Sequence, residues 1–319
     1  MRAATLPATV RGAPGWLYRR IFPRWQPRAE LRPTTSSTSG AGVRIRWLGT
    51  AGHVIETPTT TLLVDPFLTR PSLAQLAGRI APDEAAIRAR LPTRVDAVLC
   101  GHSHFDHLLD APFIARSSGA RLAGSATTCA FARAGGVDDA QLVPVPPGGR
   151  TFTVGDATIR FIPSLHGRIF LGRVPFVGEV AAPPSLPARM WHYRMGGAFG
   201  ILIDVGGVRI YHNGSADLID AELDGAQADV LLVGLAGRKA TRDYLQRLYC
   251  ALAPRLVVPT HHDAFFAPLD GGLHLLPGID LDGFVAETRL HAPAATIVTP
   301  AYDEALAIPA DARAAALAA

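Results

Sequence analysis

The sequence predicts a protein of the mixed α/β class. Short apolar runs with strand character alternate along the chain with segments of helical periodicity. Several of these runs end in loops that are rich in histidine and aspartate. The chain has 319 residues, of which 48% are hydrophobic and 18% charged, as is typical of a globular protein with a sizeable core. Together these observations favour strands and helices packed in layers, with functional groups at the strand ends.

Residues 1–42 are predicted to be an arm and linker, and residues 43–319 the folded domain. Prolines prevent a long helix in the arm, and small polar residues follow at 34–42. The arm carries +6, and because the whole chain carries +4, the domain carries −2, so we expect no nucleic-acid binding. Aromatic residues and arginines mix over residues 16–28. They indicate peripheral contact with an anionic membrane surface, packing of the arm on its own domain, or disorder.

The cellular location is predicted from absences and from cysteine usage. No apolar run is long enough to cross a membrane, and the first ten residues lack the apolar core of a secretory signal. Three widely spaced cysteines indicate reduced thiols, namely Cys100, Cys129 and Cys250. We therefore expect a cytoplasmic protein, which would lie peripherally on the inner membrane face if the arm binds lipid.

The domain is expected to begin with three strands. Residues 43–48 alternate apolar and polar, residues 53–56 return after a tight turn, and residues 61–66 form a third strand that contains Asp65 near its end. His53 is expected to be a packed strand histidine. A helix is predicted over residues 82–91, with acidic residues near its start.

The stretch from Gly101 to His107 is the strongest functional signal in the chain. It follows a short buried strand, residues 97–100, and contains His102, His104, Asp106 and His107. Imidazole and carboxylate groups bind borderline divalent metals such as zinc and manganese. A polar loop that merely contains histidines is the alternative, but four ligand-type groups at H-x-H-x-D-H spacing favour a metal site.

The rest of the domain is expected to alternate strands and helices up to an alanine-rich tail. Two segments carry further signals: His166 follows a strand end, and a long Pro/Gly-rich loop, residues 168–197 (the cover loop), comes next. Helices are predicted at 107–116, 125–134, 218–223 and 241–252, and in the tail at 303–319. Strands are predicted at 120–124, 141–146, 151–154, 157–163, 199–204, 208–212, 229–235, 255–260 and 295–299.

These motifs resemble the metallo-β-lactamase superfamily over about residues 43–270. The W-L-G-T-A-G-H and L-L-V-D-P segments at 47–53 and 62–66 and the H-x-H-x-D-H motif at 102–107 carry the resemblance. The surroundings resemble the branch that includes N-acyl-phosphatidylethanolamine phospholipase D and ascorbate-6-phosphate lactonase. The resemblance implies a four-layer αβ/βα sandwich with metal ions at one edge.

The resemblance also implies a set of metal ligands. His166 matches the third motif of the family, and His261 in P-T-H matches its closing P-x-H motif. One metal would be held by His102, His104 and His166, and the other by Asp106, His107 and His261. Asp65 would orient a ligating histidine or, alternatively, be a turn residue at a strand end.

One departure from the family pattern concerns the acid that bridges two metals. Related enzymes have Gly-Asp where this chain has Gly214-Ser215. Either Asp217 reaches in as a ligand, or it caps the following helix. In the second case the second ion would bind more weakly, or the protein would hold only one metal.

Residues around the ligands are candidates for catalysis and substrate binding. Asp106 could orient the attacking hydroxide. His262 and Asp263 are expected at the rim, either as catalytic groups or as plain surface. In the cover loop, the substrate-contact candidates are Arg173, His192, Tyr193 and Arg194, for which loop anchoring is the alternative.

The predicted function is metal-dependent hydrolysis. One or two zinc or manganese ions would lower the pKa of a bound water from about 15.7 towards 7, which yields hydroxide at neutral pH. The cover-loop arginines suit a phosphate, so a phosphodiester of a small molecule or lipid is the first substrate class. A lactone or other acyl substrate is the second. A metal-binding module without turnover is a third reading, motivated by Ser215.

Overall fold

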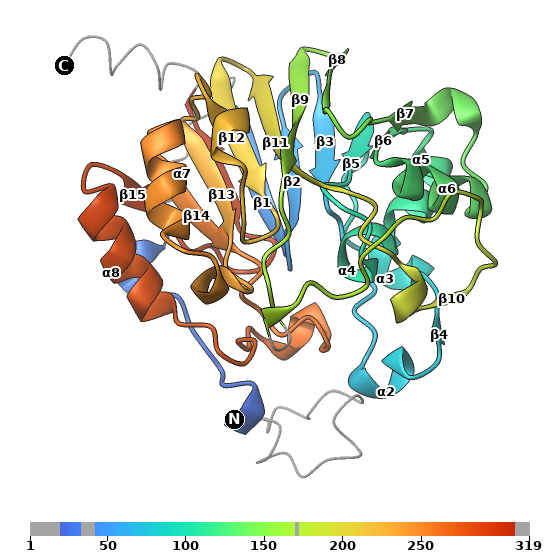
Figure 1. Ribbon diagram of the computed structural model, residues 1–319, viewed down its shortest axis with the longest axis horizontal. Coiled ribbons are helices and arrows are strands. Elements are labelled where there is room, and N and C mark those ends of the chain that lie inside the picture. Colours follow the sequence, from blue (N-terminus) through green and yellow to red (C-terminus); the bar gives the residue numbers. More distant parts are fainter. Residues whose placement is uncertain (1–19, 33–41, 170–171, 310–319) are drawn as a thin grey trace.

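Two seven-stranded sheets face each other at the centre of the part that the structure describes (Figure 1). This structure is a computed structural model, and it describes residues 20–32, 42–169 and 172–309. Helices cover the outer face of each sheet (Figure 1). The layers therefore run helix, sheet, sheet, helix, which confirms the predicted α/β sandwich.

The N-terminal sheet combines antiparallel and parallel strands. Its first members pair antiparallel, and the strands from β3 onward pair parallel. In spatial order it contains β16 (Ala305–Ile308), β1 (Val43–Gly49), β2 (Gly52–Glu56), β3 (Thr61–Val64), β5 (Ala97–Leu99), β6 (Arg121–Gly124) and β7 (Leu142–Pro144).

The C-terminal sheet is built in the same way. Strands β8 to β12 pair antiparallel, and the strands from β12 to β15 pair parallel. In spatial order it contains β15 (Thr296–Ile297), β14 (Leu256–Thr260), β13 (Val230–Gly234), β12 (Val208–Asn213), β11 (Ala198–Val205), β9 (Ala157–Ser164) and β8 (Arg150–Val154). A separate two-stranded pair joins β4 (Arg79–Ile80) to β10 (Ala188–Arg189), which lies in the cover loop.

Three apolar clusters hold the layers together. The middle cluster lies between the sheets and contains Ile45, Ile159 and Ile201. The outer clusters pack helices on the sheets. Those on the N-terminal sheet are α2 (Leu73–Leu76), α3 (Glu84–Arg88), α4 (Phe105–Leu108), α5 (Ala111–Ser118) and α6 (Ala126–Ala134), and those on the C-terminal sheet are α7 (Tyr244–Leu252) and α8 (Leu281–His291). Short 3-10 turns supplement them at Ala29–Leu31, Asp139–Gln141, Met190–His192, Asp220–Leu223, Arg238–Ala240 and Leu269–Gly271.

Several helices differ from the prediction for identifiable reasons. The helix expected at 107–116 is split into α4 and α5, because Pro112 near the start of α5 has no amide to continue a helix from α4. The helix expected at 218–223 is only a 3-10 turn. No helix was expected over Leu281–His291, where the structure has α8.

The C-terminal tail is a strand rather than a helix where it is described. Residues 305–308 form β16, which pairs with β1 from Val43 to Arg46. Helix propensity of alanine is weak compared with a free sheet edge that offers hydrogen bonds. The remainder of the predicted tail helix lies outside the described residues.

Residues 20–32 pack along the C-terminal half of the domain. Phe22 and Leu31 are buried, and Trp25 stands edge-on to His262. The Trp25 amide donates to the Leu273 carbonyl, and the Leu31 carbonyl accepts from Thr299. The described part of the arm therefore follows the packing alternative, and contact with a membrane stays a prediction; residues 16–19 lie outside the described residues.

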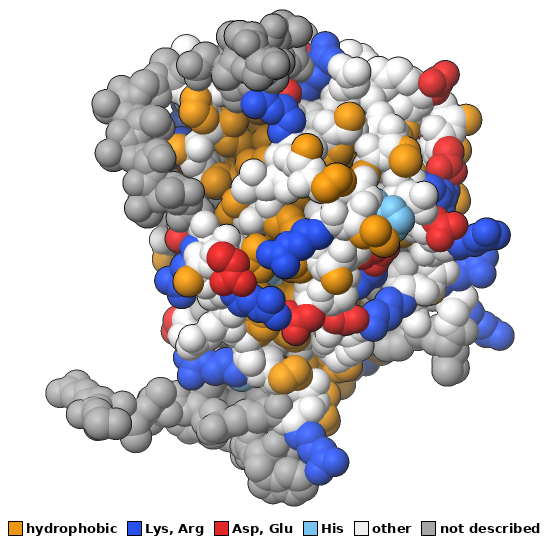
Figure 2. Space-filling view, turned by 90° about the vertical axis from the view of Figure 1, so that its left-hand side faces the viewer, with side chains coloured by type: hydrophobic (Ala, Val, Ile, Leu, Met, Phe, Trp, Pro, Cys, Tyr) orange, Lys and Arg blue, Asp and Glu red, His pale blue; other side chains and the backbone are white. Residues whose placement is uncertain are grey.

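Charges of both signs mix on the face that α7 and α8 present (Figure 2). Ion pairs on these elements include Arg247 with Asp220 and Arg238 with Glu287. Within the described residues, none of the helices has the length and apolar character needed to span a membrane.

Candidate metal centre

The candidate ligands come together at one edge of the sandwich because they follow strand ends. His102 and His104 lie on the loop after β5, and Asp106 and His107 lie on α4 directly behind it. His166 follows β9, and His261 follows β14. The two sheets thus contribute residues from both halves of the chain to one edge.

The structure arranges these residues as two adjacent groups of three. His102, His104 and His166 offer ligand atoms within 4.8 Å of one another, and so do Asp106, His107 and His261. The ring centroids of His102 and His107 are 3.8 Å apart, so the groups touch. The grouping matches the one that the family resemblance implied; the role of these residues as ligands stays a prediction.

The chemistry of the donor set fits a divalent metal. His102 Nε2, His107 Nε2 and His261 Nδ1 are buried and have no hydrogen-bond partner among the described residues. A buried polar atom without a partner is costly, and a bound cation would satisfy it. These orphaned nitrogens are the observation that supports an ion at each group.

Other ring nitrogens are held by backbone carbonyls, which orients the rings. His104 Nε2 lies 3.0 Å from the Pro175 carbonyl, and His166 Nδ1 lies 2.7 Å from the Gly167 carbonyl. Such partners commonly fix the tautomer of a metal-binding histidine and leave its other nitrogen available. The Pro175 contact also shows that the cover loop reaches the site.

Burial keeps the histidines of the first group neutral. It lowers the pKa of His104 to about 4 and that of His166 to about 3, in each case against neighbouring groups that partly raise it. Burial also lowers the pKa of His102 well below its ordinary value, and the neighbouring histidines lower it further. Neutral imidazole is the form that binds metals, so this group is ready for a cation at neutral pH.

Asp106 brings a negative charge to the second group. Burial works against ionisation of Asp106, but His107 and His261 outweigh it and hold the pKa of Asp106 below its ordinary range. Asp106 Oδ2 lies 3.3 Å from His261 Nε2 and 3.7 Å from His107 Nε2. A carboxylate beside two imidazoles offers a cation both charge and coordinating atoms.

Asp65 orients His107 from behind. Its Oδ2 accepts a hydrogen bond from His107 Nδ1 at 2.8 Å, and its Oδ1 accepts one from the Gly101 amide at 2.7 Å. Although burial opposes protonation of His107, the Asp65 and Asp106 carboxylates raise the pKa of this imidazole. The geometry is the one expected of a residue that orients a ligand, and Asp65 is buried rather than a surface turn residue.

Asp217 does not reach the two groups. Its Oδ1 accepts from the Leu218 amide and lies 4.0 Å from Arg247. The expectation that Asp217 replaces the bridging acid is therefore wrong in this structure. Ser215, which occupies the family position, accepts a hydrogen bond from the Gly167 amide at 2.9 Å and so holds the loop beside His166.

His262 and Asp263 do not lie at the rim, which corrects the prediction for both. His262 is fully buried and stacks on Trp47 with centroids 4.7 Å apart. Asp263 is also fully buried and is paired with Arg70 and Tyr302. The short motif cannot reveal this, because the chain turns inward after His261, whose φ is +53°.

The substrate-contact candidates of the cover loop have different surroundings. Tyr193 is buried and stacks on Phe131, so it anchors the loop, and its predicted substrate contact is wrong. Arg173, His192 and Arg194 are exposed, and no hydrogen bond, ion pair or ring contact in the described residues joins them to the six candidate ligands. Their role in substrate binding stays a prediction.

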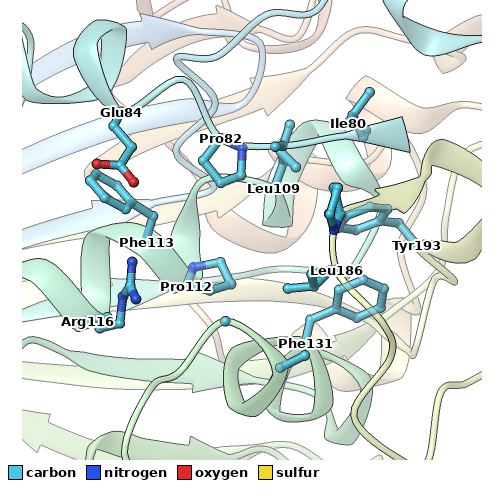
Figure 3. A pocket seen from close by; sticks show the side chains of 14 residues that line it. Ile80, Pro82, Glu84, Leu109, Pro112, Phe113, Arg116, Phe131, Leu186 and Tyr193 are labelled. Atoms are coloured by element: carbon cyan, nitrogen blue, oxygen red, sulfur yellow. The ribbon is translucent and has the colours of Figure 1, made fainter. Parts of the chain in front are cut away.

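A pocket of about 310 Å³ is lined in part by Leu186 and Tyr193 of the cover loop (Figure 3). Leu109, Phe131, Leu186 and Tyr193 line it, and none of the six candidate ligands does. It is a mainly apolar hollow between the helices and the loop, with Glu84 and Arg116 also in its lining.

The cover loop is attached at both ends to the histidine loops. Its beginning follows His166 and Gly167, and its end is fixed where the Ser103 amide donates to the Met195 carbonyl at 2.9 Å. The Phe199 amide donates to the Gly101 carbonyl, also at 2.9 Å.

Sequence reasoning missed three contributors to the site. The Pro175 and Gly167 carbonyls could not have been found, because backbone groups leave no signal in side-chain patterns. Arg70 could not have been found either, because its burial and its pairing with Asp263 appear only in the fold.

Comparisons with known proteins agree with this architecture. Residues 44–261 match the family described as the beta-lactamase superfamily domain. A UPF0173 metal-dependent hydrolase of Carboxydothermus hydrogenoformans is 30% identical over 231 residues, 70% of this chain and 86% of the relative. One of Pyrobaculum arsenaticum is 30% identical over 229 residues, 70% of this chain and 85% of the relative.

Solved structures share the fold. Igni18, a metallo hydrolase from Ignicoccus hospitalis, has a TM-score of 0.55 at 18% identity and covers 84% of this chain and 98% of its own. CmlA, a diiron beta-hydroxylase from Streptomyces venezuelae, has a TM-score of 0.55 at 16% identity over 85% of this chain and 55% of its own.

The finer resemblance, to the N-acyl-phosphatidylethanolamine phospholipase D branch, stays a prediction. The match over residues 44–261 extends from β1 to the last candidate ligand, and the curated relative reaches 30% identity over most of its length. The chain therefore belongs to the beta-lactamase superfamily and, within it, to the UPF0173 metal-dependent hydrolase family.

Proposed function

We propose that this protein hydrolyses phosphodiesters with two divalent metal ions, zinc or manganese, held by the two groups of candidate ligands. The observation that carries the proposal is the pair of touching three-residue groups, each with a buried nitrogen that has no hydrogen-bond partner among the described residues. When bound, such ions act as Lewis acids that lower the pKa of water and polarise a substrate oxygen.

The side chains around the ions have separable tasks. His102, His104 and His166 are neutral and hold one cation without cancelling its charge. Asp106 stays ionised at neutral pH because its pKa is held low, so it is a poor proton acceptor. We therefore assign it to coordination and to orienting the attacking water through a hydrogen bond, and not to general-base catalysis.

The substrate class is inferred from the rim of the site. Arg168 and Arg173 are exposed on the cover loop, and guanidinium groups suit the two charged oxygens of a phosphate. Leu165, Ile169 and Val177 are 48%, 39% and 56% exposed on the same segments. Arginines beside exposed apolar side chains support a phosphodiester with an apolar portion, such as a small organic ester or a lipid.

A direct experiment tests this proposal. Metal analysis of the purified chain should give about two ions, and bis-p-nitrophenyl phosphate should be hydrolysed with zinc or manganese. His102→Ala and His261→Ala should each lower turnover at least about 100-fold, because each removes a coordinating ring. His291→Ala at the end of α8 is the matched control, since it removes a histidine far from the ligand-bearing loops.

The outcomes separate the alternatives. Turnover of a lactone but of no phosphodiester would replace the substrate class while keeping the metal chemistry. One ion and no turnover of either would favour a metal-binding module without catalysis. Unchanged turnover in both histidine variants would overturn the site.

A further inference from the structure

We propose that Arg70 and Asp263 are positioning residues for His261, and that they set the affinity of the second group, Asp106, His107 and His261, for its ion. The metal part of this inference rests on the proposed function. The two residues form an ion pair that is buried on both sides, with side-chain exposures of 1% and 0%. Neither side chain is among the candidate ligands, so both would act on the ion indirectly, by positioning residues that are.

His261 needs support because its backbone is in an unfavourable conformation. Its φ is +53°, in the left-handed region that non-glycine residues rarely adopt. Its amide donates to the Thr50 carbonyl at 2.7 Å, and the Thr260 hydroxyl donates to the same carbonyl at 2.6 Å. The turn between β1 and β2 therefore holds the backbone on which the imidazole is mounted.

Asp263 completes the attachment to that turn. Its Oδ1 accepts from the Thr50 amide at 2.8 Å, while its Oδ2 accepts from the Tyr302 hydroxyl at 2.9 Å and from Arg70. Thr50 is thus bound through its carbonyl by His261 and through its amide by Asp263. A one-residue shift of this loop would break both contacts together.

Arg70 supplies the charge that makes the burial of Asp263 tolerable. Its φ is +46°, its guanidinium also donates to the Thr50 hydroxyl at 3.3 Å, and it lies over the Tyr302 ring at 5.2 Å. A Cβ on Gly49 would collide with this guanidinium, so glycine at that position leaves room for the ion pair.

The same loop connects the ion pair to the residues on α4. The amides of Leu68 and Thr69, directly before Arg70, donate to the Asp110 carboxylate at 2.5 and 2.8 Å. Asp110 lies at the start of α5, a few residues after Asp106 and His107. A continuous set of contacts therefore joins the two halves of the second group, one from each sheet.

The first group has its own support. His166 is held by Gly167, whose amide is bound by Ser215, and His104 is held by Pro175. None of these contacts involves Arg70 or Asp263. Loss of Arg70 or Asp263 should therefore be selective: the affinity of the second group for its ion should fall, and that of the first group should not change.

The test measures Co²⁺ binding to the full-length chain by its absorption spectrum, in competition with a chelator. Arg70→Met should lower the affinity of the second group for Co²⁺ about 10–100-fold, the range for residues that orient a ligand. The affinity of the first group should change by no more than about threefold. Arg70→Lys should recover part of the affinity because it keeps the charge. Arg238→Met is the control, since it removes another arginine with a buried side chain, 9% exposed, whose partner Glu287 is not a candidate ligand.

Two further measurements keep the test decisive. If Arg70→Met does not fold, the double variant Arg70→Met/Asp263→Leu replaces the pair by apolar side chains, which cores commonly tolerate. Nuclear magnetic resonance of the metal-free chain reports the His261 ring directly. The ¹⁵N chemical shifts of the His261 ring should change in the Arg70 variants, while those of the His102 and His104 rings stay constant.

These readouts separate this inference from the proposed function. A chain that binds no second ion would contradict the proposed function, yet a selective change at His261 in the metal-free spectra would still support the positioning role. Unchanged His261 signals and unchanged Co²⁺ affinity in folded Arg70 variants would overturn it, and so would an equal loss in Arg238→Met.

Discussion

Asp65 illustrates how much of the site depends on single carboxylates that touch no substrate. It accepts from the His107 ring and from the Gly101 amide with different oxygens. Each of these two donors needs its own acceptor oxygen. An asparagine at position 65 has only one side-chain oxygen, so one of the two donors would face its NH₂ group instead.

Replacing Asp65 by Asn should weaken the ion of the second group about 10–100-fold, because His107 loses its fixed orientation. Zinc competition titration would measure the loss. Asp139→Asn, at an exposed carboxylate with 74% side-chain exposure, is the control and should bind as wild type. Equal affinities for all three proteins would contradict the assignment.

Asp110 makes a prediction about pH. Burial raises its pKa to about 6 from an ordinary value of 3.8, although the donors of Thr69 and Leu68 act in the other direction. Between pH 4 and 6 the folded state therefore binds more protons at this site than the unfolded state, and stability falls as the pH rises.

The free energy of unfolding of wild type, relative to Asp110→Asn, should fall by up to about 3 kcal/mol from pH 4 to pH 6. Urea unfolding at several pH values measures this difference, and subtracting the variant cancels titration elsewhere. If the free energy of unfolding of wild type relative to the variant rises with pH instead, the pKa of the Asp110 carboxyl group is not raised.

The candidate ligands could be predicted at this scale because each follows a strand end in a recognisable motif. His262 and Asp263 could not, because their inward course depends on the left-handed backbone of His261. Motif spacing carries no information on such a turn.

At the scale of elements, the described part of the arm follows one of the alternatives that its composition left open. Its prolines argue against a long helix, and Phe22, Trp25 and Leu31 pack on the domain. Local composition cannot predict a partner that lies hundreds of residues away in the sequence. The strands were easier, since alternation and turn residues are local signals, whereas α8 has a weakly amphipathic pattern and was missed.

Leu31→Ala should destabilise the protein by about 2–3 kcal/mol if the segment is an integral part of the domain, because it empties a buried site. Urea unfolding followed by circular dichroism measures the change. Leu290→Ala, at a position 73% exposed on α8, should change stability by no more than about 0.5 kcal/mol. Equal stability of Leu31→Ala and wild type would mean that residues 20–32 detach in solution.

On the scale of the whole molecule, the candidate metal centre joins the two halves of the sandwich. The N-terminal sheet carries His102, His104, Asp106 and His107, and the C-terminal sheet carries His166 and His261. The mixed α/β class follows from local patterns, but the meeting of these loops follows from the order of strands in two sheets. The family resemblance implied a four-layer sandwich with metals at one edge, but the order of the strands was not predicted.

Metal should therefore stabilise the fold as a whole. Zinc at a hundred times its dissociation constant should raise the free energy of unfolding by about 2.7 kcal/mol for each ion bound. A thermal melt should show this as an increase of several degrees that a chelator reverses. The double variant His102→Ala/His107→Ala should melt at the same temperature with and without zinc, and a zinc response equal to that of wild type would contradict the site.

The double attachment of the cover loop has an evolutionary consequence. Hydrogen bonds of Gly167 and Met195 secure the two ends of the loop. We therefore expect insertions or deletions between Gly178 and Ala188 to leave the candidate ligands in place. Doubling the length of a flexible loop costs only about 0.6 kcal/mol in closure entropy. Evolution could thus vary the length and composition of this segment while the candidate ligands keep their positions.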